Sequence, residues 1–171
     1  VNLQASSGEC IGVGGRNGSG KSTLLLLAGG ALDPSHGRVV RNTREHGVLY
    51  LPQSPERLFF AETVLEEISF GLERLGVARD NARDRALAAL EKVSLDPAKF
   101  AARSPFELSY GEMRRVAFAI AFALEPELLL LDEPASCLDR DGRAVLDRLV
   151  DFARDSGGAS ACRGAVTPAD R

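Results

Sequence analysis

The chain has 171 residues, of which 44% are hydrophobic and 26% charged, and this ordinary balance predicts one sizeable folded core, or a core with a small subdomain. Its formal net charge is −3, with Lys and Arg scattered along the chain, which argues against a dedicated nucleic-acid binder. The longest apolar run, Val116–Leu124, is less than half of the roughly 20 residues that a membrane-spanning helix needs, so we expect a soluble chain.

The N-terminal part of the chain predicts short strands and one helix. A buried strand is expected at Cys10–Val13, running into a glycine-rich turn. A helix should cover Ser22–Ala28 and end at Gly29-Gly30. Further short strands are expected at Arg38–Val40 and Val48–Leu51, with turn residues between them.

From Glu62 the pattern becomes helical. Thr63 and Glu66 form a capping-box pair at the start of the first helix. A second helical segment covers Ala82–Val93, and Pro105 interrupts the pattern. The apolar face expected for the first helix consists of Leu65, Ile68, Leu72 and Leu75.

Another helix, a strand and a last helix are expected after Pro105. Ser109 and Glu112 offer a second capping box, and Leu128–Leu131, short and apolar throughout, predicts a buried strand. Asp139 or Asp141 can cap the last helix. The apolar stripe behind Ser109 consists of Met113, Val116, Ala117, Ile120, Ala121 and Leu124. The inner side expected for the last helix consists of Val145, Leu146, Leu149, Val150 and Ala153.

A glycine-rich segment between the first strand and helix carries the strongest chemical signal. Residues 15–22 fit the pattern G-x-x-x-x-G-K-[ST] at every defined position, which favours a phosphate-binding loop over a glycine-rich turn without a ligand. Lys21 can reach the β- and γ-phosphates of a nucleoside triphosphate, and the Ser22 hydroxyl can ligate Mg²⁺. The ATP-binding residues predicted here are Gly15, Asn17, Gly18, Ser19, Gly20, Lys21, Ser22 and Thr23.

Two carboxylates, Asp132 and Glu133, directly follow the strand expected at Leu128–Leu131. In a parallel sheet, ligands bind at this carboxyl edge of the strands. Asp132 is suited to hold Mg²⁺ through water, and Glu133 to polarise a water that attacks the γ-phosphate. Two solvated loop carboxylates would be the alternative for an isolated pair.

These elements together predict an α/β fold: a P-loop core with a parallel sheet, plus an inserted α-helical subdomain. The expected division is an N-terminal part of the core over residues 1–61, a helical subdomain over 62–124, and a C-terminal part of the core over 125–171.

The chain resembles the ABC ATPase family. The residues that carry the resemblance are GRNGSGKST (Gly15–Thr23), Gln53, LSYGEMRRVAFA (Leu108–Ala119), LLLLDEP (Leu128–Pro134) and Ser136–Asp139. Their order and spacing match the family across nearly the whole chain, and the third segment is the most specific, because other P-loop enzymes lack it. The resemblance implies ATP and Mg²⁺ as cofactors, with Glu133 as the catalytic residue. It adds Gln53 to the ATP-binding residues and places Ser22, Gln53 and Asp132 around the metal.

The resemblance also assigns roles outside the P-loop. Gln53 is expected to sense Mg²⁺ and to couple the core to the helical insertion. Ser109, Gly111 and Glu112 stand where the family grips the γ-phosphate bound to a second cassette, and Asp139 stands at the dimer seam. Glu112 replaces a glutamine of the family consensus, and we expect its carboxylate to turn back into its own helix.

The stretch Gln53–Gly71 is similar to the ATPase subunits of energy-coupling-factor importers, and Gly111–Ala117 supports the same subfamily. The implied function is an ATP-hydrolysing motor at the cytoplasmic face of the cell membrane. It would be a peripheral subunit paired with a second cassette, identical or paralogous, and with an integral membrane permease. Leu58–Phe60 would lie near the groove for the permease, or would only fill the interface between core and insertion.

Other classes fit less well. A DNA-repair ABC ATPase would carry a long coiled-coil insertion, a translation-type ABC protein two cassettes, and a P-loop kinase or GTPase no segment like Ser109–Glu112. A truncated or degenerate cassette that binds ATP without efficient hydrolysis stays open.

The C-terminal pattern departs from the family. The only histidines are His36 and His46, both far upstream of the acidic pair, and Pro168 occupies the place of the family's switch histidine. Arg163 and Gly164 stand where a buried apolar strand is expected; a substitution, an altered reading frame or a fragment boundary would each explain this. The chain begins at Val1, downstream of the family's adenine-stacking aromatic. We therefore expect weak Mg-ATP binding and slow hydrolysis.

Overall fold

The computed structural model describes residues 1–136, 138–156 and 158–163. In chain order the elements are β1 (Cys10–Val13), α1 (Lys21–Gly29), β2 (Val48–Leu51), the 3-10 turn η1 (Pro55–Arg57), α2 (Val64–Arg74), α3 (Arg79–Lys92), α4 (Pro97–Phe100), the 3-10 turn η2 (Pro105–Glu107), α5 (Tyr110–Leu124), β3 (Leu128–Asp132), α6 (Arg140–Asp155) and β4 (Ala159–Arg163).

The chain forms two compact units, which we call the first and the second unit. The first comprises Val1–Gln53, Pro126–Ser136 and Ala153–Arg171, and it contains the four strands and α1. The second comprises Ser54–Glu125 and Cys137–Phe152, and it contains α2 to α5 and most of α6.

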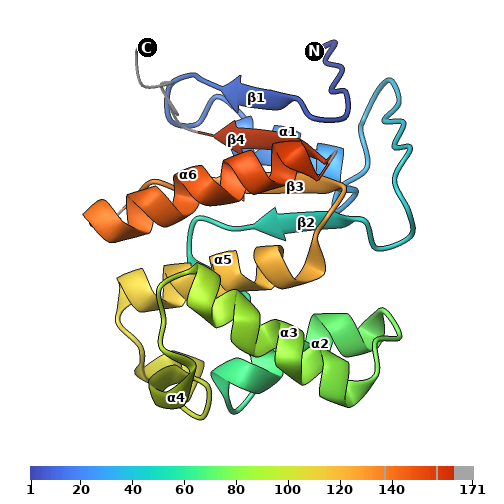
Figure 1. Ribbon diagram of the computed structural model, residues 1–171. Coiled ribbons are helices and arrows are strands. Elements are labelled where there is room, and N and C mark those ends of the chain that lie inside the picture. Colours follow the sequence, from blue (N-terminus) through green and yellow to red (C-terminus); the bar gives the residue numbers. More distant parts are fainter. Residues whose placement is uncertain (137, 157, 164–171) are drawn as a thin grey trace. The chain divides into compact units, whose positions relative to one another are not determined.

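A parallel sheet organises the first unit, as the sequence predicts. The strand order is β1-β4-β3-β2, and every neighbouring pair is parallel (Figure 1). In this register Val13 is level with Arg163, Arg163 with Asp132, and Leu51 with Leu131. The carboxyl ends of β1, β3 and β2 therefore meet at one edge of the sheet.

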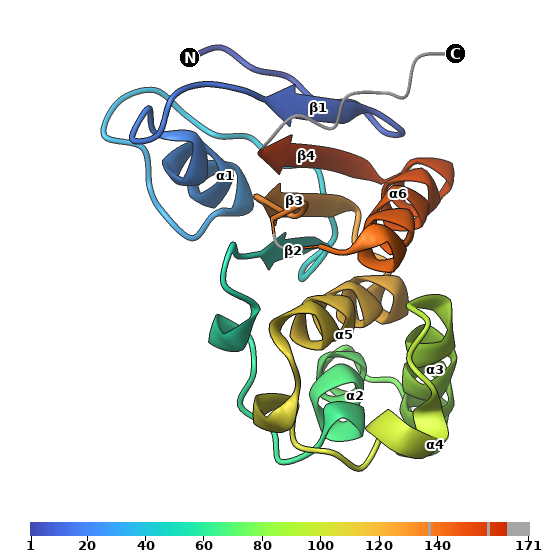
Figure 2. The same cartoon turned by 90° about the vertical axis from the view of Figure 1, so that its left-hand side faces the viewer.

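Helix α1 packs against one face of this sheet (Figure 2). Leu25 of α1 and Leu130 of β3 are both buried, and the half-buried side chains around them are Ala28, Val48, Tyr50 and Leu128. The approach is close, because a Cβ on Gly29 would lie 3.0 Å from the Leu130 side chain. The strand expected at Leu128–Leu131 is confirmed, with Leu129–Leu131 fully buried.

Strand β1 forms at its predicted bounds, but the expectation that it is buried was wrong. Its side chains are alternately exposed and half-buried. The reason is its place in the sheet order, where it lies at an edge and pairs with β4.

The strand expected at Arg38–Val40 was also wrong, because this segment has no regular structure. Val40 is 70% exposed, and within the described residues no strand pairs with it. Two β-branched residues favour extended backbone, but a strand also needs a partner that satisfies its backbone groups.

Strand β4 forms although its sequence lacks an apolar run. Ala159–Arg163 pairs through its backbone with β1 on one side and with β3 on the other. The ladder uses main-chain groups that every residue of this segment carries, which explains why Arg163 does not prevent it. Gly164 and Pro168 lie outside the described residues.

Helices α2, α3 and α5 pack together in the second unit (Figure 2). Both predicted capping boxes are confirmed: Thr63 caps α2 with Glu66, and Ser109 caps α5 with Glu112. Helix α5 is buried on all sides from Val116 to Ala123, which is more than the single apolar stripe that the sequence suggests.

The apolar face of α2 differs from the predicted one. Val64, Ile68 and Leu72, spaced four residues apart, are buried, whereas Leu65 is half-buried and Leu75 is exposed. Leu75 is the C-cap residue, so the helical periodicity no longer applies to it.

Helix α6 buries the side predicted for it, namely Val145, Leu146, Leu149, Val150 and Ala153. Among the residues that the structure describes, no helix combines the length and the apolar character required to cross a membrane.

Candidate active site

The loop between β1 and α1 is shaped by glycine. At Gly15, φ is 145°, and a Cβ there would lie 2.9 Å from the Ser19 hydroxyl oxygen. Gly20, also at positive φ, is the N-cap of α1, and no side chain caps that end. By contrast, Thr63 and Ser109 cap α2 and α5. The uncapped first turn of α1 is an end where backbone N–H groups can bind an anion.

Lys21 lies inside this loop. Its side-chain nitrogen donates to the carbonyl oxygens of Gly15 and Arg16, at 2.6 Å each, and to the Ser19 hydroxyl at 3.4 Å. Only 9% of the residue is exposed. The loop is thus folded around a cation, which is the charge that a phosphate group requires.

The second half of the site is the end of β3. Asp132, the last residue of the strand, is buried. Glu133 follows with φ of 48°, a left-handed conformation that is uncommon for a residue with a side chain. Ser136 supports this turn, because its backbone N–H and its hydroxyl both donate to the Glu133 carbonyl oxygen, at 3.1 and 2.9 Å. Backbone strain of this kind concentrates at functional sites.

Gln53, two residues after β2, contacts the acidic pair. Its side-chain amide nitrogen lies 2.7 Å from a carboxylate oxygen of Glu133. The structure therefore brings together two residues that the sequence connects only through the family resemblance.

Tyr50 is a residue at this edge that the sequence analysis missed. Its hydroxyl donates to the Oδ2 atom of Asp132 at 3.0 Å. No local sequence pattern points to it: the contact follows from the pairing register of β2 and β3, in which Tyr50 is level with Leu130, two residues before Asp132.

All predicted P-loop residues, Gln53, Asp132 and Glu133 belong to the first unit. The strand register places the loop after β1 and the acidic pair at the same edge of the sheet, since Val13 and Asp132 are both level with Arg163. The loop that contains Lys21 and the two carboxylates therefore lie at the same edge of the sheet.

Ser109, Gly111 and Glu112 lie at the start of α5 in the second unit. The Glu112 carboxylate accepts hydrogen bonds from the Ser109 backbone N–H at 2.8 Å and from its hydroxyl at 2.7 Å. These bonds hold the pKa of Glu112 below its usual value, with weaker attraction from Arg103 and Arg115. The expectation that Glu112 turns back into its own helix is confirmed.

Tyr110 stands beside this box. Its ring lies under the Arg114 guanidinium, 5.5 Å from ring centroid to charge centre, and its hydroxyl accepts from Arg114 at 3.0 Å. Arg114 itself is buried. Tyr110 is therefore fixed along its own helix.

Asp139, also in the second unit, caps α6: its carboxylate accepts from the Gly142 backbone N–H at 2.7 Å. Of the two candidate caps, the structure supports Asp139 over Asp141. Its place at a dimer seam stays a prediction.

The donor set fits Mg²⁺. Ser22, Gln53 and Asp132 offer hydroxyl, amide and carboxylate oxygens, the hard ligands that this ion prefers. Within the described residues no group of three or more His, Cys, Asp or Glu side chains could hold a metal. Such a sparse set suits Mg²⁺, which takes most of its ligands from nucleotide phosphates and water.

A family model described as ABC transporter matches residues 1–136. Among curated proteins, the chain is 41% identical to the energy-coupling factor transporter ATP-binding protein EcfA2 of Symbiobacterium thermophilum over 169 residues, which cover 90% of this chain and 58% of that protein. It is 37% identical to EcfA2 of Clostridium tetani over 170 residues, 91% of this chain and 58% of that one. The chain spans 54% to 66% of the length of the curated relatives it matches.

Solved structures agree. CbiO1 of Clostridium perfringens, described as part of the ABC transporter complex cbiONQ, superposes with a TM-score of 0.77 and 27% identity, covering 96% of this chain and 70% of that one. The ATP-binding cassette MJ0796, solved as a dimer in a post-hydrolysis state bound to ADP and Pi, gives 0.84 and 27%, covering 95% and 77%.

Proposed function

This chain belongs to the ABC transporter family, and from that premise we propose that it binds and hydrolyses ATP as the motor subunit of an energy-coupling-factor-like membrane importer. The observation that carries the proposal is the placement of the Lys21 loop and the Asp132–Glu133 pair at one edge of a parallel sheet.

In this proposal the loop binds the triphosphate. The N–H groups of residues 15–23 surround the β- and γ-phosphates, and Lys21 exchanges its contacts with Gly15 and Arg16 for phosphate oxygens. Ser22, Gln53 and Asp132 would hold Mg²⁺, Asp132 through water. Bound Mg²⁺ supplies charge neutralisation at the β- and γ-phosphates.

Glu133 acts as the general base. To polarise a water in line with the γ-phosphate, its carboxylate accepts a hydrogen bond from that water, and it can do so while Oε2 keeps the hydrogen bond from Gln53. The backbone at Glu133 is left-handed, and a hydrogen bond from Ser136 supports it. This conformation sets the direction in which the Glu133 side chain leaves the end of β3.

The active form is proposed to be a pair of cassettes, identical or paralogous. Ser109, Gly111 and Glu112 would act on the ATP of the partner cassette, and Asp139 would lie at the seam. The dimeric form of MJ0796 supports this for a relative of 27% identity.

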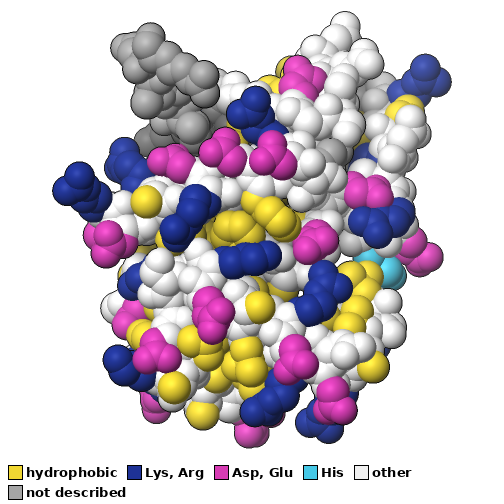
Figure 3. All heavy atoms as spheres, viewed as in Figure 1, with side chains coloured by type: hydrophobic (Ala, Val, Ile, Leu, Met, Phe, Trp, Pro, Cys, Tyr) yellow, Lys and Arg dark blue, Asp and Glu magenta, His cyan; other side chains and the backbone are white. Residues whose placement is uncertain are grey.

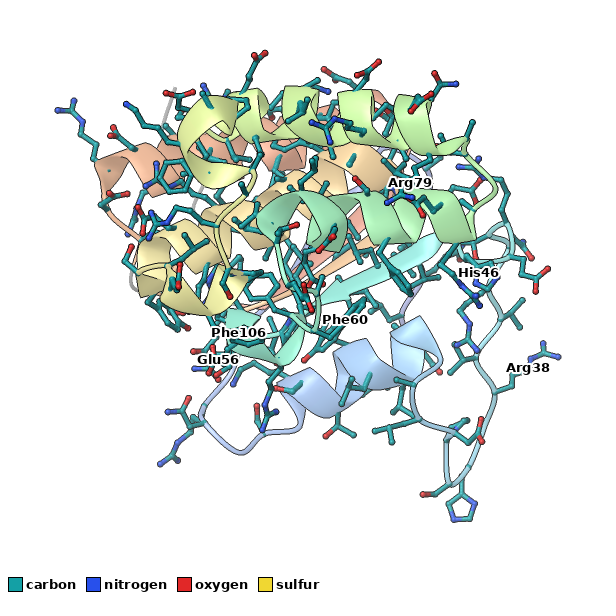
Figure 4. All side chains as sticks on the ribbon, turned by 90° about the horizontal axis from the view of Figure 1, so that it is seen from below. Arg38, His46, Glu56, Phe60, Arg79 and Phe106 are labelled. Atoms are coloured by element: carbon teal, nitrogen blue, oxygen red, sulfur yellow. The ribbon has the colours of Figure 1, made fainter. Side chains whose placement is uncertain are left out.

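The membrane partner is proposed to contact aromatic side chains of the second unit. Phe60 is 61% exposed and packs edge-on against Phe70 at 4.8 Å, and Phe106 is also more than half exposed. Figure 4 shows Phe60 and Phe106 toward the same side of that unit. Of the segment Leu58–Phe60, Phe59 is buried in the protein, so Phe60 is the residue available to a permease. The chain would then lie peripherally at the cytoplasmic face of the membrane.

No nucleic-acid partner is proposed. On the face drawn in Figure 3, acidic and basic side chains are interspersed, and the formal net charge is −3. Such a surface lacks the single-sign basic patch on which nucleic-acid binding depends.

A second candidate is a cassette that binds ATP and turns it over slowly. The observation that favours it is the Ser109–Glu112 pair, because the serine hydroxyl donates its hydrogen to Glu112, and a carboxylate stands where a phosphate would approach. Comparing nucleotide binding with steady-state hydrolysis on the same preparation separates the two candidates.

The test of the nucleotide site is an ATP titration of the Lys21→Ala variant in the presence of Mg²⁺. Loss of one charge-assisted contact of about 1.5–3 kcal/mol should weaken affinity about 10- to 100-fold. Lys99→Ala, which removes an exposed lysine of α4 paired with Asp96, is the matched control and should bind like the parent chain. Equal affinities of all three proteins would refute the proposed site.

A further inference from the structure

Tyr50 and Asp132 lie on the same face of the sheet. Strands β2 and β3 are parallel, and Tyr50 is level with Leu130. Because side chains alternate between the two faces of a strand, Asp132, two residues beyond Leu130, shares the face of Leu130 and Tyr50. The sheet thus places the phenol beside the carboxylate without any loop rearrangement.

Packing fixes the position of the Tyr50 ring. The ring contacts the cluster of Leu25 and Leu130 beneath α1, together with Val48 of its own strand. From there its hydroxyl reaches Oδ2 of Asp132 at 3.0 Å. A phenol that donates from a packed ring loses little conformational freedom when it makes this bond.

The acceptor of this hydrogen bond, Asp132, is a buried carboxylate, since only 4% of the residue is exposed. A buried carboxylate requires hydrogen-bond donors, and a donor in a fixed place also fixes the orientation of its two oxygens. A hydrogen bond to one oxygen of a carboxylate thereby sets the orientation in which the carboxylate meets a metal or a metal-bound water.

We propose that Tyr50 is a positioning residue for Mg²⁺: its hydroxyl orients Asp132 so that this carboxylate meets the metal of the bound nucleotide. The inference rests on the proposed function, in which Asp132 serves Mg²⁺, and it adds a residue outside the P-loop, the acidic pair and Gln53. Metal binding then depends on a residue of β2, Tyr50, whose ring packs beneath α1.

The alternative is that the phenol only fills the core beneath α1. In that case removing its hydroxyl while keeping its ring would leave metal binding unchanged, and a packing defect elsewhere in the cluster would have the larger effect. The two views therefore separate on Tyr50→Phe, which keeps the ring and deletes the hydrogen bond.

The experiment measures ATP binding by the purified chain, first in EDTA and then as Mg²⁺ is titrated. Tyr50→Phe should raise the half-saturating Mg²⁺ concentration about tenfold, the lower end of what outer-shell partners of metal ligands contribute, while affinity in EDTA stays that of the parent. Val48→Ala is the matched packing control, since it thins the same cluster on the same strand without touching the carboxylate. It should not change the Mg²⁺ requirement.

A double-mutant cycle with Asp132→Asn tests whether Tyr50 affects Mg²⁺ binding through Asp132. If Tyr50 acts through Asp132, Tyr50→Phe has no further effect on the Mg²⁺ requirement in the Asn background. The inference is overturned if Tyr50→Phe leaves the half-saturating Mg²⁺ concentration unchanged, if Val48→Ala raises it equally, or if the full effect persists beside Asp132→Asn. Absence of ATP binding by the parent chain in both conditions would instead refute the nucleotide site itself.

Discussion

The side-chain amide of Gln53 donates a hydrogen bond to a carboxylate oxygen of Glu133, 2.7 Å away. The two residues follow adjacent strands, β2 and β3, so the hydrogen bond connects the carboxyl ends of these two strands. In this conformation the proposed base and the proposed metal sensor contact each other directly.

Glu133→Gln should abolish hydrolysis while ATP binding persists. Glutamine keeps the shape and can still accept from Gln53, but it cannot take a proton from water, so turnover should fall at least about 100-fold. Glu127→Gln is the matched control: Glu127 precedes β3, at the opposite end of the strand, and pairs with Arg44. Steady-state phosphate release decides between them, and turnover that survives in Glu133→Gln would exclude this carboxylate as the base.

Glu112 should make the stability of the α5 end depend on pH. Its pKa is lowered in the folded chain by the two bonds from Ser109, so its stabilising effect is present above the unfolded value near 4.5 and is lost as pH falls through the folded pKa. Glu112→Gln should therefore lower the free energy of unfolding at neutral pH, by about 0.3–1 kcal/mol for a charge at a helix N-terminus.

Urea denaturation at pH 7 and at pH 4 or below measures this difference. The gap between the parent and Glu112→Gln should shrink progressively as the pH falls below 4.5, because the parent then loses the stabilising charge as the pH approaches and passes the folded pKa. Glu73→Gln, on the exposed side of α2, serves as the reference substitution. A gap that stays constant across the two pH values would contradict the role assigned to the Ser109 bonds.

Gly15→Ala should lower both the thermal stability of the chain and its affinity for ATP. The new Cβ would lie 2.9 Å from the Ser19 hydroxyl oxygen, at a backbone φ of 145° that residues with side chains avoid. A strained residue of this kind costs about 1–3 kcal/mol. Gly12→Ala in β1, where a Cβ would meet nothing within 4 Å, should change neither thermal stability nor ATP affinity. If both alanine variants behave alike, the loop tolerates a side chain and the steric argument fails.

Ile68→Ala should be far more damaging than Leu75→Ala. Ile68 is fully buried in the second unit, and its truncation leaves a cavity worth about 2–5 kcal/mol of unfolding free energy. Leu75 is 44% exposed at the end of α2, and its truncation should change the free energy of unfolding by about 0.5 kcal/mol or less. If chemical denaturation shows equal losses of unfolding free energy for the two variants, Leu75 contributes to the apolar core as the sequence predicts.

The elements read most reliably from the sequence are those whose signal is local. The capping boxes at Thr63 and Ser109 and the buried run of β3 depend on residues a few positions apart, and all three form as predicted. The P-loop and the acidic pair are likewise short patterns, and the parallel order of the strands brings them to one edge.

What the sequence could not give depends on pairing over long distances. Tyr50 and Asp132 are 82 positions apart, and their contact follows from the register of β2 against β3, which no local pattern encodes. The wrong strand at Arg38–Val40 has the same origin, because extended propensity says nothing about the presence of a partner.

The position of β4 has a consequence for how the chain acquires its site during synthesis. Among the strands that the structure describes, β4 comes last in the chain, yet it stands between β1 and β3, so β1 has no neighbour in the sheet until Ala159–Arg163 has left the ribosome. A polypeptide that stopped at residue 158 would contain every P-loop residue and both carboxylates, yet β1 would have no strand linking it to them. Nucleotide affinity should thus increase when a truncated chain is extended through residues 159–163.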